Sequence, residues 1–275
     1  MKKIILNFCF YVGIAVIIVV ALFPLYYAII SSFKSGTEIF KVSYLPFPFE
    51  LENYISIFTK NHFEINLLNS FIVSTMVVAI SLILGITAAY ALGRIQFKGR
   101  FTLLLIILSA SMFPQIAVLA GLYEIIGKMG MFNSLYSLIL SYMIFVIPFT
   151  VWVLTVFMRD FPDELEKAAL IDGASTFTII FKIIMPILWP SLVSVGLLSF
   201  IAAWNEFLFA LTFLSSDEMR TVPVAIALLS GTTEYEIPWG NIMAASVIVT
   251  VPLVVLVFIF QRKIISGLTA GAVKG

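Results

Sequence analysis

The chain has 275 residues, of which 61% are hydrophobic and only 11% are charged, and its mean hydropathy is +1.12. Soluble domains carry about 25% charged residues, so this composition indicates an integral membrane protein. The net charge of +1 argues against nucleic acid as a partner. The single cysteine, Cys9, cannot form an internal disulfide, and we expect it to be an inert small apolar residue.

Six windows without charged residues predict an all-α protein with six transmembrane helices. Each window exceeds the roughly 20 residues that a helix needs to cross a hydrocarbon core of about 30 Å. A membrane barrel is excluded, because its strands would have about 10 residues of alternating polarity. We therefore expect one membrane domain over residues 1–275. The windows are Ile4–Phe33, Ile65–Gly93, Phe101–Tyr123, Met129–Met158, Ile183–Asn205 and Ile237–Gln261.

The first window differs from a secretory signal. The apolar core of a signal has about 7–15 residues and is followed by a small-residue cleavage site. The uncharged run from Ile4 to Phe33 is longer than that and has no such site near its end. We expect it to be a retained first span.

The basic residues predict how the spans are oriented. Eleven Lys and Arg residues fall in the segments on one side of the predicted spans, and five fall on the other side. The positive-inside rule therefore places both termini and the segment 159–189 in the cytoplasm. Two outer segments are long, 31–68 and 215–241, and the second is acidic. The only histidine, His62, lies in the first of these, where we expect a solvated loop residue.

The segment 159–189 is a polar insert between two apolar windows. Its sequence predicts two short helices on either side of a glycine. Pro162 and the carboxylates after it suit the first turn of a helix. Gly173 can adopt a positive φ and end that helix, and Ser175 can cap a second helix that runs to Ile184. Helical spacing predicts that Leu165, Ala168, Ala169 and Asp172 share one face of the first helix, and that Phe177, Ile180, Phe181 and Ile184 form an apolar stripe on the second.

Two interpretations of this insert remain open. It could be a docking surface for a cytoplasmic partner, or a pair of amphipathic helices that lie on the lipid surface. The first helix is acidic, and anionic lipid would repel it, which favours docking.

The run from Glu166 to Ala174 resembles the coupling loop, or EAA motif, of ABC importer permeases. It is most similar to the carbohydrate-uptake class that includes maltose and trehalose transporters. The resemblance extends to Ala203-Trp204-Asn205-Glu206 and to the ending from Gln261 to Gly275. It implies the type I permease fold with a cytoplasmic coupling-helix insert, in a prokaryotic cytoplasmic membrane.

The resemblance also implies the partners and the cofactors. They are a second homologous permease, two ATP-binding-cassette ATPase subunits, an extracytoplasmic sugar-binding protein and membrane lipid. ATP and magnesium would be bound by the ATPase subunits. This agrees with the chain itself, which has no G-x-x-x-x-G-K-[ST] loop and no cluster with metal-ligand spacing, so we expect neither an enzyme nor a resident cofactor.

Residues of the insert are expected to contact the ATPase. At the first position of the EAA triplet the chain has Lys167, where the family usually has a glutamate that pairs with an arginine of the ATPase. Nearby acids, Glu164, Glu166 and Asp172, could supply that charge instead. The resemblance further implies that Thr233, Glu234 and Tyr235 contact the binding protein and that the tail 264–275 reaches the ATPase interface. The coupling residues are Glu164, Glu166, Lys167, Ala168, Ala169, Asp172, Gly173, Ala174, Phe177 and Phe181.

Glu206 is the one acid inside a predicted span. A charge at this depth costs on the order of 3 kcal/mol or more, so such residues usually face a cavity or a partner. Glu206 could line the substrate path, or it could be protonated or paired with the second subunit. The candidate substrate-path residues are Asn69, Gln115, Trp204, Asn205 and Glu206.

Two alternatives to an ATP-driven permease remain. An ion-gradient-driven secondary transporter would need paired intramembrane acids and an inverted repeat, which the chain does not display. A membrane scaffold that recruits cytoplasmic proteins would need no transport path. The sugar itself cannot be read from the chain.

Overall fold

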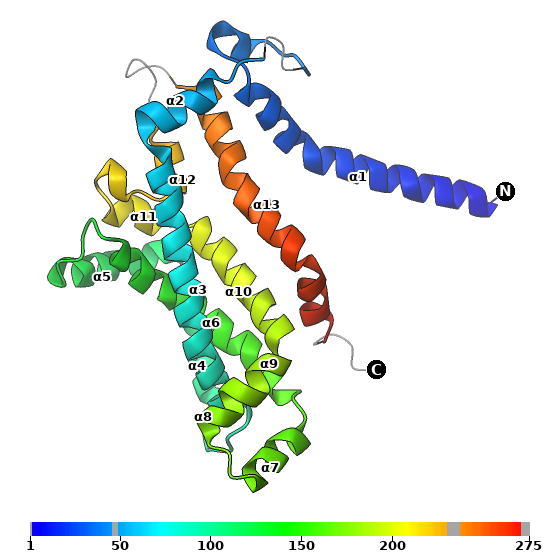
Figure 1. Ribbon diagram of the computed structural model, residues 1–275, viewed down its shortest axis with the longest axis vertical. Coiled ribbons are helices and arrows are strands. Elements are labelled where there is room, and N and C mark those ends of the chain that lie inside the picture. The colour runs from blue at the N-terminus through cyan, green and yellow to red at the C-terminus, as the bar shows by residue number, and fades with distance from the viewer. Residues whose placement is uncertain (1, 46–48, 230–236, 271–275) are drawn as a thin grey trace. The chain divides into compact units, whose positions relative to one another are not determined.

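The computed structural model describes residues 2–45, 49–229 and 237–270, and for 2, 4, 5 and 262–270 it describes the backbone alone. The chain divides into two compact units. The first comprises Met1–Glu64 with Ala225–Pro252, and the second comprises Ile65–Val224 with Leu253–Gly275. Each unit is described by itself (Figure 1).

Four long apolar helices could each cross a membrane, which confirms four of the expected spans. They are α1 (Lys2–Ser32), α3 (Phe63–Gly93), α6 (Leu135–Arg159) and α13 (Trp239–Ala270). Pro24, Pro148 and Pro252 lie inside α1, α6 and α13. The last helix extends past the expected span end at Gln261 and through the first part of the segment 264–275.

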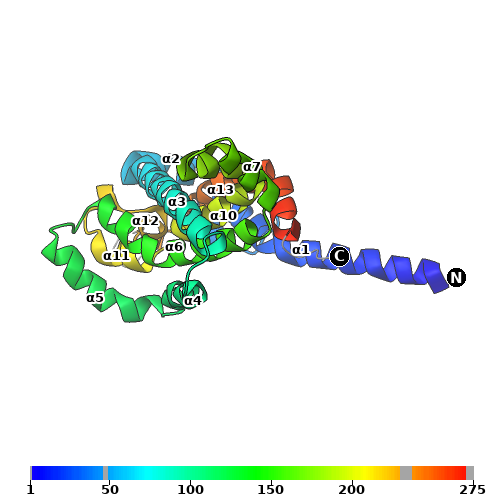
Figure 2. The ribbon, with the colours of Figure 1, turned by 90° about the horizontal axis from the view of Figure 1, so that it is seen from below.

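The expected third span, Phe101–Tyr123, is a bent pair of helices. Helices α4 (Arg100–Ala110) and α5 (Gln115–Lys128) meet at an angle of 89°. Pro114 stands directly before α5, has no N–H to donate and disfavours helical geometry in the residue before it. Figures 1 and 2 show α5 turned away from the direction of α4. The prediction of one continuous helix was therefore wrong. The two helices together still have the length and the apolar composition of one membrane span.

The expected fifth span, Ile183–Asn205, begins later than predicted. Helix α10 (Trp189–Trp204) meets the helical run Thr176–Ile187 at 83°. Its 16 residues rise only about 24 Å. The apolar chain then continues into the short helix α11 (Leu208–Phe213). With both bent pairs counted as spans, the described residues hold up to six crossings, and the expected all-α membrane fold is confirmed.

The insert contains two short helices, as expected. The first, α7, covers Asp163–Ile171. The second runs through α8 (Thr176–Thr178), a π-helical turn η2 (Ile179–Ile184) and α9 (Met185–Ile187), three residues further than predicted. The remaining short elements are η1 (Gly36–Phe40), α2 (Glu52–Asn61), η3 (Asp217–Met219) and α12 (Val222–Ala227).

Small residues let α3 approach its neighbours closely in the second unit. A Cβ on Gly93 would lie 2.7 Å from the Cβ of Met158, and one on Gly85 would lie 2.5 Å from the Cγ2 of Thr150, both on α6. Helices without a hydrophobic driving force between them in lipid associate by such close packing. The pair α3 and α6 thus forms a closely packed support for the insert that follows α6.

Candidate coupling site

Helix α7 begins and ends at residues whose local chemistry predicts its ends. Pro162 precedes it, and three acids occupy its first turn, where the helix dipole favours negative charge. At its C-terminus Gly173 adopts φ +76°, as expected. The amide of Ala174 donates to the carbonyl of Ala169 at 3.0 Å, and that of Gly173 donates to Leu170 at 3.1 Å. This pair of bonds is the Schellman motif, which satisfies carbonyls that the helix end leaves free.

The second helix of the insert is capped by Ser175. Its hydroxyl accepts a hydrogen bond from the amide of Thr178 at 3.2 Å, which confirms the expected cap. The four residues of the expected apolar stripe differ in burial. Ile180 and Ile184 are buried, Phe181 is half-buried and Phe177 is 70% exposed. The rings of Phe177 and Phe181 lie 4.4 Å apart.

The face predicted for α7 is exposed except at one residue. Of the four residues predicted to share a face, Ala169 is buried, whereas Leu165, Ala168 and Asp172 are exposed. Glu166, three residues before Ala169, lies on the inner side with 14% of its side chain exposed. The inner face is set by Glu166 and Ala169 because α3 and the end of α6 occupy that side.

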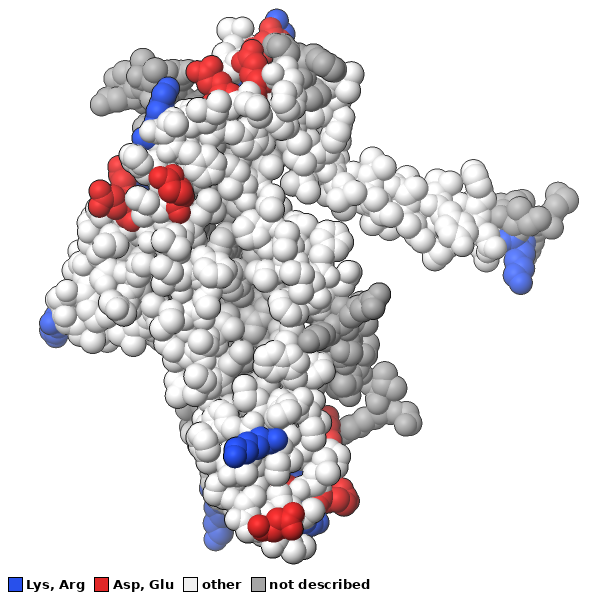
Figure 3. Space-filling model, in the orientation of Figure 1, with Lys and Arg blue, Asp and Glu red and all other residues white. Residues whose placement is uncertain are grey.

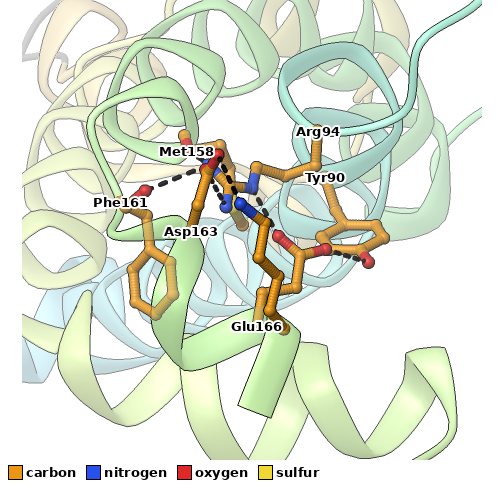
Figure 4. A network of polar contacts seen from close by, with 7 residues as sticks. Tyr90, Arg94, Met158, Phe161, Asp163 and Glu166 are labelled. Atoms are coloured by element: carbon orange, nitrogen blue, oxygen red, sulfur yellow. Dashed lines mark hydrogen bonds and ion pairs between the residues drawn. The ribbon is translucent and has the colours of Figure 1, made fainter. Parts of the chain in front are cut away.

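Arg94, directly after the last residue of α3, binds the start of α7 (Figure 4). Its Nε lies 2.7 Å from Glu166 Oε2, and its Nη2 lies 2.6 Å from Asp163 Oδ1. Its Nη1 donates to the carbonyl of Phe161 at 3.0 Å. Tyr90, one helical turn earlier on α3, donates its hydroxyl to Glu166 Oε1 at 2.6 Å. One guanidinium therefore joins α3, the turn after α6 and the first turn of α7.

The Arg94 guanidinium is charged at every pH at which the protein would be studied. Burial by itself would lower the pKa of Arg94, but the hydrogen bond and charge of Glu166, with those of Asp163, raise it above its ordinary value. Its side chain is 8% exposed, so the pair with Glu166 is shielded from water. Arg94 and Tyr90 were not among the expected site residues, because nothing in the sequence indicates which distant acid a basic residue will meet.

The outer face of the insert is an exposed mixture of apolar and charged side chains. Leu170, Ile171 and Phe177 are 55%, 86% and 70% exposed. We call the set Leu165, Leu170, Ile171 and Phe177 the apolar knob; it lies among the exposed Glu164, Lys167 and Asp172, and Ala174 next to it is half-buried. In Figure 3 charged side chains gather around α7 at the bottom of the view, and the surface directly above them is nearly free of charge.

The candidate substrate-path residues have separate neighbours. Asn69 is buried, and its amide donates to the backbone carbonyls of Glu218 at 2.8 Å and Arg220 at 3.1 Å. The structure thus gives Asn69 a role in holding the η3 turn. Gln115 is exposed at the start of α5. The side-chain amide of Asn205, also exposed, donates to the carbonyl of Ile201 at 2.9 Å.

Glu206 lies at the break between α10 and α11. Its two carboxylate oxygens accept hydrogen bonds from the amides of Phe209 at 2.9 Å and Ala210 at 3.2 Å. A buried acid is thereby satisfied by the free N–H groups of a helix start within the same chain. Trp204 beside it is 2% exposed and stacks on Phe200, and its indole N–H is buried without an acceptor.

Three further expected contacts, Thr233, Glu234 and Tyr235, lie outside the described residues. Among the side chains that the structure describes, no group of three or more His, Cys, Asp or Glu residues comes together as a metal site.

A family model described as "Binding-protein-dependent transport system inner membrane component" matches residues 81–269. That match includes α3 from its middle onward, the insert and nearly all of α13. The chain belongs to this family. The resemblance of the chain to ABC importer permeases is thereby confirmed.

Several relatives that are similar along nearly their whole length are named as permease proteins of transport systems for sugars or sugar derivatives. The trehalose/maltose transport system permease protein MalG of Thermococcus litoralis is 41% identical over 266 residues, which are 96% of this chain and 95% of the relative. The trehalose transport system permease protein SugB of Mycobacterium tuberculosis is 38% identical over 255 residues, 93% of each chain. The sulfoquinovosyl glycerol transport system permease protein SmoH of Agrobacterium fabrum is 36% identical over 267 residues, 96% of this chain and 93% of the relative.

Solved structures agree on the fold. A chain of a bacterial ABC transporter involved in the import of the acidic polysaccharide alginate superposes with a TM-score of 0.82 at 21% identity, over 95% of this chain and 97% of that one. A second, from an alginate ABC transporter in complex with an alginate-bound periplasmic protein, has a TM-score of 0.68 at 16% identity, over 95% of each chain. At these identities the likeness supports the ABC importer permease fold alone.

The comparisons settle the class of protein. It is a multi-pass membrane permease of the prokaryotic ABC importer class, and its relatives are transport subunits and not enzymes.

Proposed function

We propose that the chain is the permease subunit through which an importer couples ATP hydrolysis to uptake of a di- or oligosaccharide of the maltose or trehalose type. The observation that carries the choice of sugar is the 41% identity to a trehalose/maltose permease over 96% of the chain. A second homologous permease, two ATPase subunits and an extracytoplasmic sugar-binding protein complete the transporter, with both termini of this chain in the cytoplasm.

The insert provides the contact with the ATPase in this proposal. Exposed apolar side chains surrounded by charge are typical of protein interaction sites, and the apolar knob has this character. Glu164, Lys167 and Asp172 are exposed beside it and are free to meet the partner. Glu166 is held by Arg94 and Tyr90, so we assign the acidic contacts to Glu164 and Asp172.

The Arg94 contacts explain how movement of the insert could reach the membrane. Arg94 binds two carboxylates of α7 and the carbonyl of Phe161 while its backbone continues from α3. A displacement of α7 by the ATPase therefore acts on α3 directly. The spans then change from inward-open to outward-open. The segment 215–241, with Thr233, Glu234 and Tyr235, remains our candidate for the contact with the binding protein.

Transport in vesicles tests this function. The chain is reconstituted with its partner subunits, and uptake of labelled maltose and trehalose is measured with the binding protein outside and ATP trapped inside. We expect uptake that requires both ATP and the binding protein. Uptake driven by an imposed proton gradient without ATP would support the secondary-transporter alternative and overturn the proposal. ATP-dependent uptake of a different sugar would overturn only the choice of sugar.

A further inference from the structure

A polar cavity of about 430 Å³ lies beside the insert in the second unit. It is formed where α3 ends, α4 begins, α6 ends and α7 passes. Its lining includes four cationic side chains, Arg94, Arg100, Arg159 and Lys167, and two carboxylates, Asp163 and Glu166. The lining thus has a formal excess of two positive charges, in a chain whose total net charge is +1.

The two carboxylates of the cavity are already bound. Both lie within 2.7 Å of nitrogens of Arg94. Lys167 is 3.9 Å from Asp163 across two well-exposed side chains, which is a weak contact. No carboxylate among the described residues forms an ion pair with Arg100 or Arg159. The excess charge therefore belongs to Arg100, Arg159 and Lys167.

Of these three basic residues, Arg100 is the one whose charge is balanced neither by a helix dipole nor by full exposure to water. Arg159 stands in the last turn of α6, where a cation suits the negative end of the helix dipole. Lys167 is mostly solvated. Arg100, in contrast, is half-buried, and its Nη1 is fully buried with no acceptor among the described residues. Buried donors nearly always have a partner, so the Arg100 guanidinium has unused hydrogen-bonding capacity beside the cavity that it lines.

The cavity lies next to apolar surface that a membrane would cover. Arg100 is the first residue of α4, and the side chains of Phe101, Leu105 and Ile106 that follow it are 61%, 48% and 60% exposed. A ligand with an anionic head in the cavity and an apolar tail along α4 would cover both. Basic pockets at the ends of membrane helices bind the head groups of anionic lipids in this manner.

We propose that this cavity binds the phosphate of an anionic phospholipid head group, with Arg100 and Arg159 as donors. An acidic side chain of a cytoplasmic protein could also be an acceptor. The phospholipid is favoured because Arg100 is the first residue of α4, whose exposed apolar side chains a membrane would cover. Lys167 and Leu170 of the insert also line the cavity, so the test below includes the ATPase subunits. A phosphate group accepts several hydrogen bonds from two guanidinium groups at once, which suits this pair.

The test measures lipid binding to the full-length chain, purified in a non-ionic detergent and stripped of lipid. Phosphatidylglycerol and phosphatidylcholine with the same acyl chains are titrated while melting is followed by intrinsic fluorescence, and bound lipid is counted by native mass spectrometry. We expect phosphatidylglycerol to raise the melting temperature more than phosphatidylcholine. Arg100→Gln and Arg159→Gln should each weaken the phosphatidylglycerol effect about fivefold in concentration. Lys98→Gln, an exposed position two residues before Arg100 that does not line the cavity, should behave as the unaltered protein.

Several outcomes would overturn the proposal. One is an unchanged preference for phosphatidylglycerol in Arg100→Gln, and another is equal weakening by Lys98→Gln. An equal, Arg100-dependent effect of inorganic phosphate alone would assign the cavity to the free anion. Loss of phosphatidylglycerol binding when the ATPase subunits are added would assign it to a protein carboxylate. If Arg100→Gln is unstable before lipid is added, the effect of Arg159→Gln on the number of bound phosphatidylglycerol molecules decides whether the cavity is the binding site. The lipid-binding test does not depend on whether the protein transports sugar.

Discussion

Arg94 shows how one side chain can join the end of α3 to a segment that lies 67 to 72 residues further along the chain. It reaches Glu166 and Asp163 on α7 and a backbone carbonyl at Phe161, with only 8% of its side chain exposed. Its planar group with five donors suits several acceptors at fixed angles, and lysine has no such geometry. Arg94 is therefore a positioning residue for α7 in the proposed mechanism.

Arg94→Lys should uncouple the transporter. A lysine keeps the charge but cannot bind both carboxylates and the carbonyl together, so α7 should move without moving α3. We expect sugar uptake to fall at least about tenfold while ATP hydrolysis by the assembled complex continues, because about 1.4 kcal/mol of lost coupling suffices for that factor. The measurement is the ratio of sugar transported to ATP hydrolysed in vesicles. Lys98→Gln, in the exposed turn after α3, is the matched control, and a normal ratio in Arg94→Lys would contradict the positioning role.

Glu206 offers a choice between a structural and a transport role. It is the acid that the sequence places within a span, and both of its oxygens accept amides at the start of α11. Removing a helix cap costs about 0.5–2 kcal/mol. The side chain can be tested by separating its effect on stability from its effect on the substrate.

Glu206→Ala should lower the melting temperature of the purified chain and leave the KM for sugar uptake unchanged, since the carboxylate is occupied by Phe209 and Ala210. Glu206→Gln keeps one acceptor oxygen, so its melting temperature should fall about half as far as that of Glu206→Ala. Glu124→Gln, in an exposed pair with Lys128, should change stability by less than about 0.5 kcal/mol. A raised KM with an unchanged melting temperature would instead assign Glu206 to the substrate path.

At the scale of elements, the insert is a stiff pair of helices whose turn depends on one glycine. Gly173 has φ +76°, and no other group lies within 4 Å of the position of an added Cβ. A substitution there is therefore disfavoured by the backbone conformation and not by crowding. For residues other than glycine that conformation costs about 1–2 kcal/mol, more for branched side chains.

Gly173→Val should abolish or strongly reduce sugar uptake while membrane insertion remains normal. The reason is that the turn between α7 and α8 would open and the apolar knob would lose its arrangement. Gly130→Val is the matched control, because Gly130 also has a positive φ of +66° with free space around it but lies outside the insert. Equal loss of uptake in both variants would attribute the effect to general instability and contradict the coupling role.

The broken third span is the other element-scale feature. An apolar window of 23 residues satisfies the length rule, yet the chain turns by 89° between Ala110 and Gln115. Pro114, directly before α5, has no N–H to donate, but this property alone does not indicate a turn of this size. Hydropathy measures how a segment partitions between water and lipid, and it carries little information on the direction of the helix within the lipid.

At the scale of the whole molecule, the orientation in the membrane stays a prediction from the basic residues. Eleven Lys and Arg on the side of the insert against five on the other side predict cytoplasmic termini. The chain has one cysteine, Cys9, which simplifies a direct test.

In a Cys9→Ser background, Lys98→Cys and Ser215→Cys should react differently with a membrane-impermeant maleimide added to intact cells. Both positions are exposed. We expect Ser215→Cys to be labelled directly, and Lys98→Cys to be labelled only after the membrane is permeabilised. The Cys9→Ser protein without a new cysteine is the control for background labelling. The reverse pattern would invert the orientation and place the insert outside.

The sequence by itself determined the membrane class, the positions of the apolar segments and the local form of the insert. These depend on segments that are continuous in the chain: apolar length decides partition into lipid, and Pro162, Gly173 and Ser175 act on their own neighbours. Only the tertiary structure decided that Glu166 turns inward to Arg94, 72 residues away, and that Asn69 holds the turn at Glu218, 149 residues away. Composition cannot specify such pairs, because they depend on which distant helices pack together.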